Sequence, residues 1–404
     1  MKLLFITPYL PGPPIFGGQR RIHGLMTSLA ASHELSLISL TDGNLDQRHA
    51  ELEAKQYCRD VITVPQHEHR PDGANKRLTQ LRSLLSQHSW EKRIYKRPAV
   101  QDAIDRHLAT RTYDAIICEF VFMANYQLRR ARDRTQLVLD EHNVEYDVLR
   151  RTTENARFDR RVFQAVNWRK LKHEEVRAWK RFDGCTLTSR RDEAIVNMEA
   201  PQTQTAVVPN AVDLAEFSPR DVPEQPLTLL FFGAINYYPN TDAAVSFSEQ
   251  VMPLLTPHYP SLRLRIVGPG ETALKGKLGS NVELTGFVSV LQAELARASV
   301  VVAPIRIAGG TRLKILEAMA MGKAIVATRI GAEGLDVQHG HDILLADSPA
   351  EQAREIRRVL DDAALRAQLG RNARATAVAR YSWDAAAKKL ESFVQQLKES
   401  SIAG

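Results

Sequence analysis

The feature that most constrains the fold of this chain is a segment in which two apolar runs, residues 299–305 and 324–330, flank a glycine-rich turn and a helical pattern. Runs of this length and composition are typical of buried strands. Between them Gly309 and Gly310 interrupt the apolar pattern, and apolar residues then recur at helical spacing until Gly322 ends the helix. The segment therefore predicts a strand–helix–strand unit, which is the building block of parallel sheets.

The turn of this unit favours the binding of an anion, because backbone N–H groups and the positive end of the helix dipole converge there. Thr311 occupies the expected N-cap position, and Arg312 and Lys314 add two cations to the first helical turn. Such cations destabilise a helix N-terminus by about a few tenths of a kcal/mol, and a bound anion would offset this effect. Glu317 follows roughly 7 Å along the axis, at ~1.5 Å per residue, within reach of a ribose beside a diphosphate. The alternative is an ordinary turn with a solvated arginine and lysine.

Residues 309–335 resemble the donor-binding segment of glycosyltransferase family four, a group of nucleotide-sugar-dependent enzymes with the GT-B fold. The resemblance is strongest to the bacterial branch associated with exopolysaccharide and surface-glycan synthesis, and family-like segments cover nearly the whole chain. The family usually has two glutamates in this segment; Glu317 matches the second, whereas Gly309 replaces the first. The residues that the resemblance places at the donor are Gly310, Thr311, Arg312, Lys314 and Glu317.

A chain of 404 residues, of which 44% are hydrophobic and 25% are charged, suits two α/β domains of about 200 residues each. Its three cysteines are far apart and lack metal-ligand spacing, so neither a disulfide framework nor a metal site is expected. No apolar run is long enough to span a membrane, and the N-terminus lacks the pattern of a signal peptide. These features predict a cytoplasmic protein.

The net charge of +7 lies in the first half of the chain. Residues 1–205 contain 33 Lys and Arg against 26 Asp and Glu, whereas residues 206–404 contain 21 of each. The basic residues concentrate in residues 76–97 and 150–181, where they mix with apolar side chains at roughly helical spacing. This distribution favours an anionic partner such as a membrane surface or a lipid diphosphate, and no recognisable motif favours nucleic acid. The alternative is that both stretches are helices packed on the domain with solvated basic faces.

Residues 2–7 predict a first buried strand, which a Pro-rich loop joins to a helix after Gly17 and Gly18. The loop does not match G-x-G-x-x-G, so a dinucleotide fingerprint is not supported. In the family that the chain resembles, this loop faces the cleft between the domains and touches donor phosphates or the acceptor. That role for Gly17 and Gly18 competes with a purely structural turn.

A later strand of the first half ends in the sequence DEHNVEYD. A side chain at the carboxyl end of a parallel strand lies where α/β sheets bind ligands. His142, with Asn143 and Glu145, reproduces a histidine context of family four, and the resemblance implies that His142 hydrogen-bonds a hydroxyl of the donor sugar. Asp140 and Glu141 either act on the acceptor or cap the helix that follows.

In the second half, a strand at residues 228–232 precedes a loop in which many family members carry an arginine and a lysine for the diphosphate. This chain instead has Asn236, Tyr237, Pro239 and Asn240. We infer that Arg312 and Lys314 supply the missing cations. By resemblance, the loop at Gly268 and the backbone near Phe287 flank the nucleotide base.

We therefore expect an α/β chain with the GT-B fold, in which two doubly wound, Rossmann-like parallel sheets face each other across a cleft. The first domain spans residues 1–205, with its last strand at residues 185–189, and is joined by a C-terminal helix at about residues 382–400. The second, nucleotide-sugar-binding domain spans residues 206–381.

The function that the resemblance implies is transfer of a hexosyl group from a UDP- or GDP-sugar to a hydroxyl of a glycan or polyprenyl-linked glycan. His142, Arg312 and Lys314 would be the catalytic residues, the anomeric configuration would be retained, and neither a metal nor a cofactor would be needed. The basic first half predicts peripheral contact with an anionic membrane, at the inner face of the plasma membrane. Two alternatives stay open: a nucleotide-sugar 2-epimerase on the same fold, and a non-catalytic protein that binds nucleotide or glycan.

Overall fold

The computed structural model describes residues 1–14, 16–41, 45–66, 79–80, 82–128, 135–154, 158–276, 278–307 and 311–403. The chain divides into two compact units, of which the first comprises Met1–Asn210 and Trp383–Gly404 and the second comprises Ala211–Ser382. The C-terminal helix therefore belongs to the first unit, although the whole second unit precedes it in the chain. The sequence placed the boundaries at 205/206 and 381/382, whereas the compact units divide at 210/211 and 382/383.

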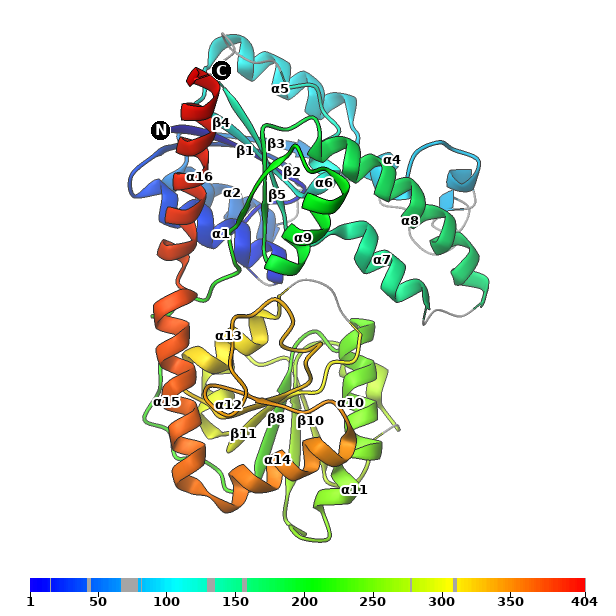
Figure 1. The fold of residues 1–404 in the computed structure, drawn as a ribbon, viewed down its shortest axis with the longest axis vertical. Helices are drawn as coiled ribbons and strands as arrows, with labels where there is room; N and C mark the ends of the chain where they lie inside the picture. The colour runs from blue at the N-terminus through cyan, green and yellow to red at the C-terminus, as the bar shows by residue number, and fades with distance from the viewer. Residues whose placement is uncertain are drawn as a thin grey trace. The chain divides into compact units, whose positions relative to one another are not determined.

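Seven parallel strands form the sheet of the first unit, in the order β3-β2-β1-β4-β5-β6-β7 (Figure 1). They are β1 (Lys2–Thr7), β2 (Glu34–Thr41), β3 (Asp60–Pro65), β4 (Ala115–Glu119), β5 (Gln136–Glu141), β6 (Gly184–Leu187) and β7 (Gln204–Val207). The order reverses between β1 and β4, and the carboxyl ends of strands at such a reversal are where α/β sheets bind ligands. The prediction that the strand near residues 185–189 ends this sheet is wrong, because β7 follows it. β7 is a four-residue edge strand that is only partly buried, so it lacks the apolar pattern that marks the central strands.

Helices cover both faces of this first sheet. They are α1 (Gly17–Ala30), α2 (Leu45–Tyr57), α4 (Trp90–Tyr95), α5 (Pro98–Thr110), α6 (Phe120–Met123), α7 (Glu145–Glu154), α8 (Phe158–Trp179), α9 (Arg190–Glu199) and α16 (Trp383–Ala403). Side chains of α5, α8 and α9 enter one buried cluster with β1 and β2. On α1, Gly24 lets the indole of Trp383 pack directly on the helix, since a Cβ there would lie 2.2 Å from the ring. The first residue of α16 is thereby fixed against α1.

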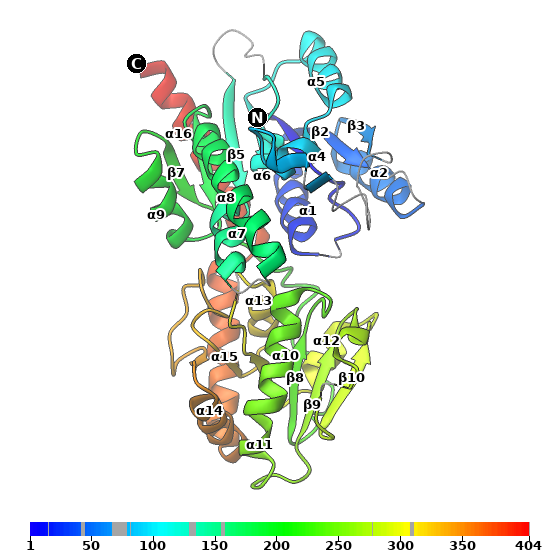
Figure 2. The same ribbon diagram turned by 90° about the vertical axis from the view of Figure 1, so that its right-hand side faces the viewer.

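Six parallel strands form the sheet of the second unit, in the order β10-β9-β8-β11-β12-β13. Figure 2 shows the side of this sheet that contains β8, β9 and β10. They are β8 (Thr228–Phe232), β9 (Arg263–Val267), β10 (Val282–Gly286), β11 (Val300–Ala303), β12 (Ile325–Ala327) and β13 (Leu344–Leu345). This order reverses between β8 and β11. A second switch point therefore lies at the carboxyl ends of these two strands.

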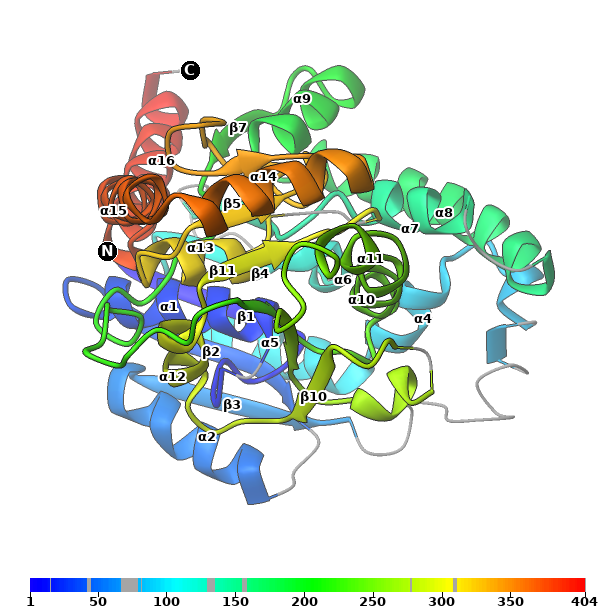
Figure 3. The same cartoon turned by 90° about the horizontal axis from the view of Figure 1, so that it is seen from below.

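The helices of the second unit also form two layers. One layer contains α10 (Tyr238–Gln250), α11 (Met252–Leu255) and α14 (Pro349–Asp361), and the other contains α12 (Leu291–Arg297), α13 (Leu313–Ala320) and α15 (Ala363–Arg380). Figure 3 shows α15 end-on while α14 runs across the view. In α13 every side chain from Ile315 to Ala320 is buried, which explains the apolar spacing that first indicated this helix.

Candidate functional site

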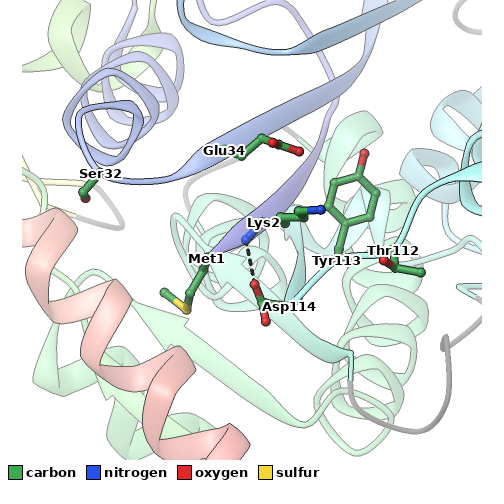
Figure 4. A pocket seen from close by; sticks show the side chains of 7 residues that line it. All are labelled: Met1, Lys2, Ser32, Glu34, Thr112, Tyr113 and Asp114. Atoms are coloured by element: carbon green, nitrogen blue, oxygen red, sulfur yellow. Dashed lines mark hydrogen bonds between the residues drawn. The ribbon is translucent and has the colours of Figure 1, made fainter.

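A hollow of ≈ 560 Å³ lies at the amino ends of β1 and β4, where Figure 4 shows the side chains that line it. Its lining residues are Met1, Lys2, Ser32, Glu34, Thr112, Tyr113 and Asp114. The backbone N–H of Lys2 donates to the Asp114 carboxylate over 2.7 Å and fixes the start of β1. The clusters of polar side chains described next lie instead at the carboxyl ends of strands. These are the ends at which parallel α/β sheets bind ligands.

A desolvated salt bridge lies at the carboxyl end of β5. Arg21 of α1 donates through Nε and Nη2 to the two carboxylate oxygens of Asp140, over 2.8 and 2.7 Å, and both residues are fully buried. Nη1 of the same arginine donates to Asn210 over 3.2 Å. Thr186 Oγ1 donates to Asp140 over 2.6 Å. Because both charges are paired and hydrogen-bonded, this pair rigidly joins α1 to β5.

His142 lies beside this salt bridge and is held on three sides. Its Nε2 is 2.7 Å from Oε2 of Glu119, the last residue of β4, and 3.8 Å from Asp140. The ring of Phe120 packs on the imidazole with centroids 3.7 Å apart. Thr188 Oγ1 donates to the backbone carbonyl of His142 over 3.1 Å. The imidazole is only 6% exposed, and these contacts fix its orientation.

Burial and the neighbouring charges set the protonation of this cluster. Burial opposes ionisation of Asp140, but the guanidinium of Arg21 outweighs it and lowers the pKa of that carboxyl. Burial and then the Asp140 carboxylate raise the pKa of Glu119 well above its usual value. Burial also lowers the pKa of His142 to about 3. These shifts favour an ionised Asp140 paired with Arg21, a protonated Glu119 and, at neutral pH, an uncharged His142 imidazole.

The same cluster has the composition of a metal site. Ligand atoms of Glu119, Asp140 and His142 all lie within 4.8 Å of one another. Both oxygens of Asp140, however, already accept hydrogen bonds from Arg21. A metal ion would have to displace that guanidinium or sit beside its positive charge. The donor set thus fits a hydrogen-bonded cluster better than a metal centre.

Neither carboxylate that precedes His142 in the chain caps the following helix, so that alternative is wrong. Asp140 is engaged in the salt bridge, and Glu141 accepts from the backbone N–H of Val121 over 3.2 Å and from Trp179 Nε1 over 3.0 Å. The N-terminus of α7 is capped by Glu175 of α8, which accepts two backbone N–H bonds there. An acceptor role for Asp140 and Glu141 stays a prediction, and both side chains are fully buried.

The predicted loop glycines lie at the start of α1. Gly17 is its first residue, and a Cβ on Gly18 would lie 2.0 Å from the Tyr9 hydroxyl and 3.3 Å from the Phe120 ring. Gly18 therefore makes room for the loop that follows β1, which is a structural reason for a glycine at this position. Contact of Gly17 and Gly18 with donor or acceptor stays a prediction.

In the second unit, two glycines bring neighbouring strand ends into contact. Gly233 and Gly268 follow β8 and β9 directly and have φ of +135° and +142°. A Cβ on Gly268 would lie 1.9 Å from the carbonyl oxygen of Gly233. A Cβ on Gly233 would in turn lie 3.0 Å from Nζ of Lys314. The ammonium of Lys314 therefore lies directly against the backbone at the end of β8.

Lys314 reaches from α13 to this strand end. Its Nζ donates to Asn240 Oδ1 over 2.7 Å and lies 4.4 Å from the centroid of the Phe231 ring. Asn240 is itself fixed, because its amide donates to the backbone carbonyl of Ala234 over 2.8 Å. Burial and then the charge of Arg312 lower the pKa of Lys314 to about 7. A negatively charged ligand would stabilise the protonated ammonium, so this position is suited to an anion.

The helix that carries Lys314 begins later than the sequence predicts. α13 begins at Leu313, and Arg312 rather than Thr311 occupies the N-cap position, with extended backbone angles and no side-chain cap bond. Threonine is a preferred N-cap residue, but Thr311 is not the N-cap here because helical backbone angles begin only after Arg312. At the other end Gly322 has φ of +68° and closes α13 in a Schellman arrangement, as predicted. Gly310 lies outside the described residues.

The remaining predicted residues lie around the same edge of the second sheet. Glu317 is buried on α13, one turn after Lys314, whereas Phe287 follows β10 and is 72% exposed. Arg306, which follows β11, is already engaged in a bidentate salt bridge with Asp242 over 2.9 and 2.7 Å. The structure thus brings Lys314 to the glycines of β8 and β9, while the ligand-binding roles of all these residues stay predictions.

Three residues that shape the two clusters were missed from the sequence. Glu119 is the one acidic residue of a strand that is otherwise apolar, and this signal could have identified it. Asn240 was interpreted only as a departure from the family pattern, although it positions Lys314. Arg21 had no such signal, because its partner Asp140 lies 119 positions away in the chain.

Comparison with known proteins gives one family match. Residues 226–362 match the family described as Glycosyl transferases group 1. D-inositol 3-phosphate glycosyltransferase from Pseudarthrobacter chlorophenolicus is 32% identical over 211 residues, which cover 46% of this chain and 49% of that protein. The chain thus matches about half the length of this curated relative.

Solved structures match the chain over nearly its full length. Sucrose-phosphate synthase from Thermosynechococcus elongatus has a TM-score of 0.73 at 18% identity, and the match covers 99% of this chain and 100% of that one. HepE from Anabaena, solved in complex with UDP and glucose, has a TM-score of 0.65 at 15% identity over 100% of both chains. At these identities the likeness shows the fold, and the predicted GT-B fold is confirmed.

Proposed function

We propose that this chain, a glycosyltransferase by its GT-B fold and by the family match of its second unit, moves a hexosyl group from a nucleoside-diphosphate sugar to an acceptor hydroxyl. The observation that carries the proposal is the position of Lys314. Its ammonium lies against a glycine backbone at the switch point of the second sheet, with a pKa lowered to about 7 by burial and by Arg312. A diphosphate placed there would neutralise both cations.

The donor is a UDP- or GDP-sugar. The Anabaena neighbour HepE was solved in complex with UDP-glucose, which supports a nucleotide-sugar donor for this fold. Arg312 and Lys314 stabilise the charge that develops on the leaving diphosphate, which is the task that a metal ion performs in other transferases. Glu317 binds the ribose hydroxyls, and the backbone near Gly268 and Phe287 flanks the base.

The reaction retains the anomeric configuration by attack on the same face of the sugar from which the diphosphate leaves. The acceptor oxygen forms a bond to the anomeric carbon as the bond from that carbon to the phosphate oxygen breaks. The acceptor proton passes to the leaving phosphate oxygen, so no carboxylate nucleophile is needed. His142 orients the donor sugar through a hydroxyl and acts more strongly in the transition state than in the ground state.

The acceptor is a glycan or a polyprenyl-linked glycan met at an anionic membrane surface. No helix in the described part of the chain is long and apolar enough to cross a bilayer. Peripheral attachment would instead use the basic first unit, because basic residues near an anionic leaflet contribute about 1 kcal/mol each.

The function is tested by release of nucleotide from candidate donors, and the site by variants of the full chain. We expect UDP or GDP to bind by titration calorimetry. Glu317→Ala should weaken that binding by about 1.5–3 kcal/mol, which is the value of a hydrogen bond to a charged group, while leaving inorganic pyrophosphate affinity unchanged. Glu249→Ala, which removes an exposed glutamate of α10, is the control and should change neither.

Two results would contradict these assignments. Equal losses of nucleotide and pyrophosphate affinity in Glu317→Ala would remove Glu317 from the ribose. Absence of both binding and nucleotide release with every UDP- and GDP-sugar tried would overturn the proposed transferase.

A further inference from the structure

We infer that Glu119 is a positioning residue for His142: its carboxylic acid donates a hydrogen bond to Nε2 and thereby places the imidazole proton on Nδ1. This inference deepens the proposed function, since it rests on His142 meeting the donor sugar. It specifies that His142 donates the hydrogen bond in that contact, because a histidine with its proton on Nδ1 presents a donor at this nitrogen.

Glu119 has the imidazole of His142 as a hydrogen-bond partner, and its side chain is also within hydrogen-bond reach of the Asp140 carboxyl. Its Oε2 lies 2.7 Å from Nε2 of His142. The other oxygen, Oε1, is buried and has no hydrogen-bond partner in the described part of the chain. A fully buried carboxylate with one unpaired oxygen would be costly, whereas a neutral acid avoids most of that desolvation cost.

Asp140 is the other group close enough to share the proton, but its bonding is already extensive. Its two oxygens accept from Arg21 twice and from Thr186 once, all over 2.6–2.8 Å. The bidentate guanidinium keeps this carboxyl ionised, and the three hydrogen bonds occupy three of its roughly four acceptor sites. We assign the Glu119 proton to His142 because Oε2 lies 2.7 Å from Nε2, and the neutral ring has one nitrogen able to accept it.

Within the described ranges no side chain is hydrogen-bonded to the second ring nitrogen of His142. Among the described residues, Nε2 makes the one side-chain hydrogen bond of this histidine. Since Glu119 donates to Nε2, the neutral ring must carry its proton on Nδ1. That N–H is then the donor that remains for a ligand oxygen such as a sugar hydroxyl.

The turn that carries Glu119 also fixes the plane of the imidazole. Phe120, the next residue, has φ of +66°, an unusual conformation for a residue other than glycine. Strain of this kind is of order 1–3 kcal/mol and persists where the surrounding structure requires it. This conformation places the centroid of the Phe120 ring 3.7 Å from that of the imidazole. Phe120 therefore fixes the plane of the His142 ring, and the preceding residue, Glu119, sets its tautomer.

The tautomer can be measured directly in the full-length protein labelled with 15N-histidine, with the His142 signal assigned by comparison with His142→Gln. We expect the wild-type ring to be protonated at Nδ1. Glu119→Ala should shift the proton to Nε2, lower kcat at least tenfold and leave UDP affinity within twofold, because the nucleotide residues belong to the second unit. Glu119→Gln can donate the same hydrogen bond and should retain the Nδ1–H form and most of the turnover.

Glu175→Gln is the matched control, since Glu175 is an equally buried carboxyl of the same unit that caps α7. It should leave the His142 tautomer unchanged even where it lowers Tm. Protonation at Nε2 in the wild type, or an unchanged tautomer in Glu119→Ala, would overturn the inference, as would loss of the Nδ1–H form in Glu119→Gln. Confirmation of the tautomer in a protein without transferase activity would overturn the proposed function and leave the assignment of Glu119 intact.

Discussion

At the scale of single residues, Lys314 has the most unusual environment in the second unit. Its ammonium donates to Asn240 and lies over the Phe231 ring, and burial and Arg312 lower its pKa to about 7. In the free protein Lys314 therefore loses its proton at a much lower pH than an ordinary lysine. A bound diphosphate would raise that pKa, so binding of the proposed donor should be coupled to proton uptake.

This coupling predicts a pH dependence of nucleotide affinity. Above pH 7 the free protein loses the Lys314 proton, whereas the complex keeps it until the higher pKa of the bound state is reached. Affinity for UDP or GDP should therefore fall as pH rises from about 7 to 9, by up to about tenfold per pH unit. Calorimetry in buffers of different ionisation enthalpy would measure the protons taken up on binding.

Lys314→Met is the control for this prediction, because it retains an unbranched apolar stem without the charge. Its nucleotide affinity should be lower at pH 7 and nearly independent of pH above that value. Parallel pH profiles for the wild type and Lys314→Met would show that another group is responsible.

The sequence predicted some of these residues and not others for a physical reason. His142 and Lys314 could be placed at strand ends because apolar runs mark parallel strands, and ligands meet such strands at their carboxyl ends. The family resemblance then singled them out; the family match covers residues 226–362 and so includes Lys314 but not His142. Their supports, Arg21 and Glu119, depend on contacts between distant parts of the chain that no local pattern encodes.

At the scale of elements, the central strands were predictable and the edges were not. β1 and β8 have the predicted bounds, because each is an apolar run buried on both faces. The edge strands β7 and β13 are short and partly exposed, so they carry no such signal. The start of α13 was misplaced because capping preference describes the side chain, whereas the backbone decides where a helix begins.

The contact between the loops after β8 and β9 gives a prediction at this scale. Gly268→Ala would put a methyl group 1.9 Å from a backbone carbonyl at φ of +142°, so one loop must move. We expect a loss of about 3 kcal/mol or more in the free energy of unfolding. Nucleotide affinity should fall as well, because the displaced loop contains Gly233, which lies against Lys314.

Gly340→Ala is the matched control for Gly268→Ala. Gly340 also has a positive φ, of +79°, but a Cβ there would meet nothing within 4 Å. It should therefore lose only about 1–2 kcal/mol, the cost of the backbone conformation, and should bind nucleotide normally. Equal destabilisation by the two substitutions in chemical denaturation would show that the close loop contact is unimportant.

At the scale of the whole molecule, the excess positive charge belongs to the first unit. Part of its basic stretch serves the fold: Lys170 of α8 donates to the backbone carbonyls of Ser83 and Leu84 over 2.9 and 3.0 Å. The first part of residues 76–97 lies outside the described residues. Packing thus accounts for some of the basic residues. This agrees with the alternative that these stretches are helices packed on the domain.

Other residues of the same region are exposed and combine apolar with basic side chains, as expected for a membrane contact. Leu85 is 93% exposed and Val162 is 54% exposed, although both are apolar. Arg161 and Arg169 lie on the exposed surface of α8, the helix that carries Val162. Basic and apolar side chains that share an exposed surface are typical of segments that bind anionic membrane interfaces.

We therefore expect the full-length protein to sediment with vesicles that contain anionic lipid, and to be released as added salt screens the charges. The double variant Arg161→Glu/Arg169→Glu should weaken this binding by at least about 2 kcal/mol, since each basic residue near the surface contributes about 1 kcal/mol. Lys388→Glu/Lys389→Glu makes the same charge change on exposed residues of α16 and should bind nearly as well as the wild type. A wild-type protein that stays in the supernatant with anionic vesicles at low salt would show that these side chains do not bind membranes, and equal losses in the two double variants would show that net charge rather than α8 directs the attachment.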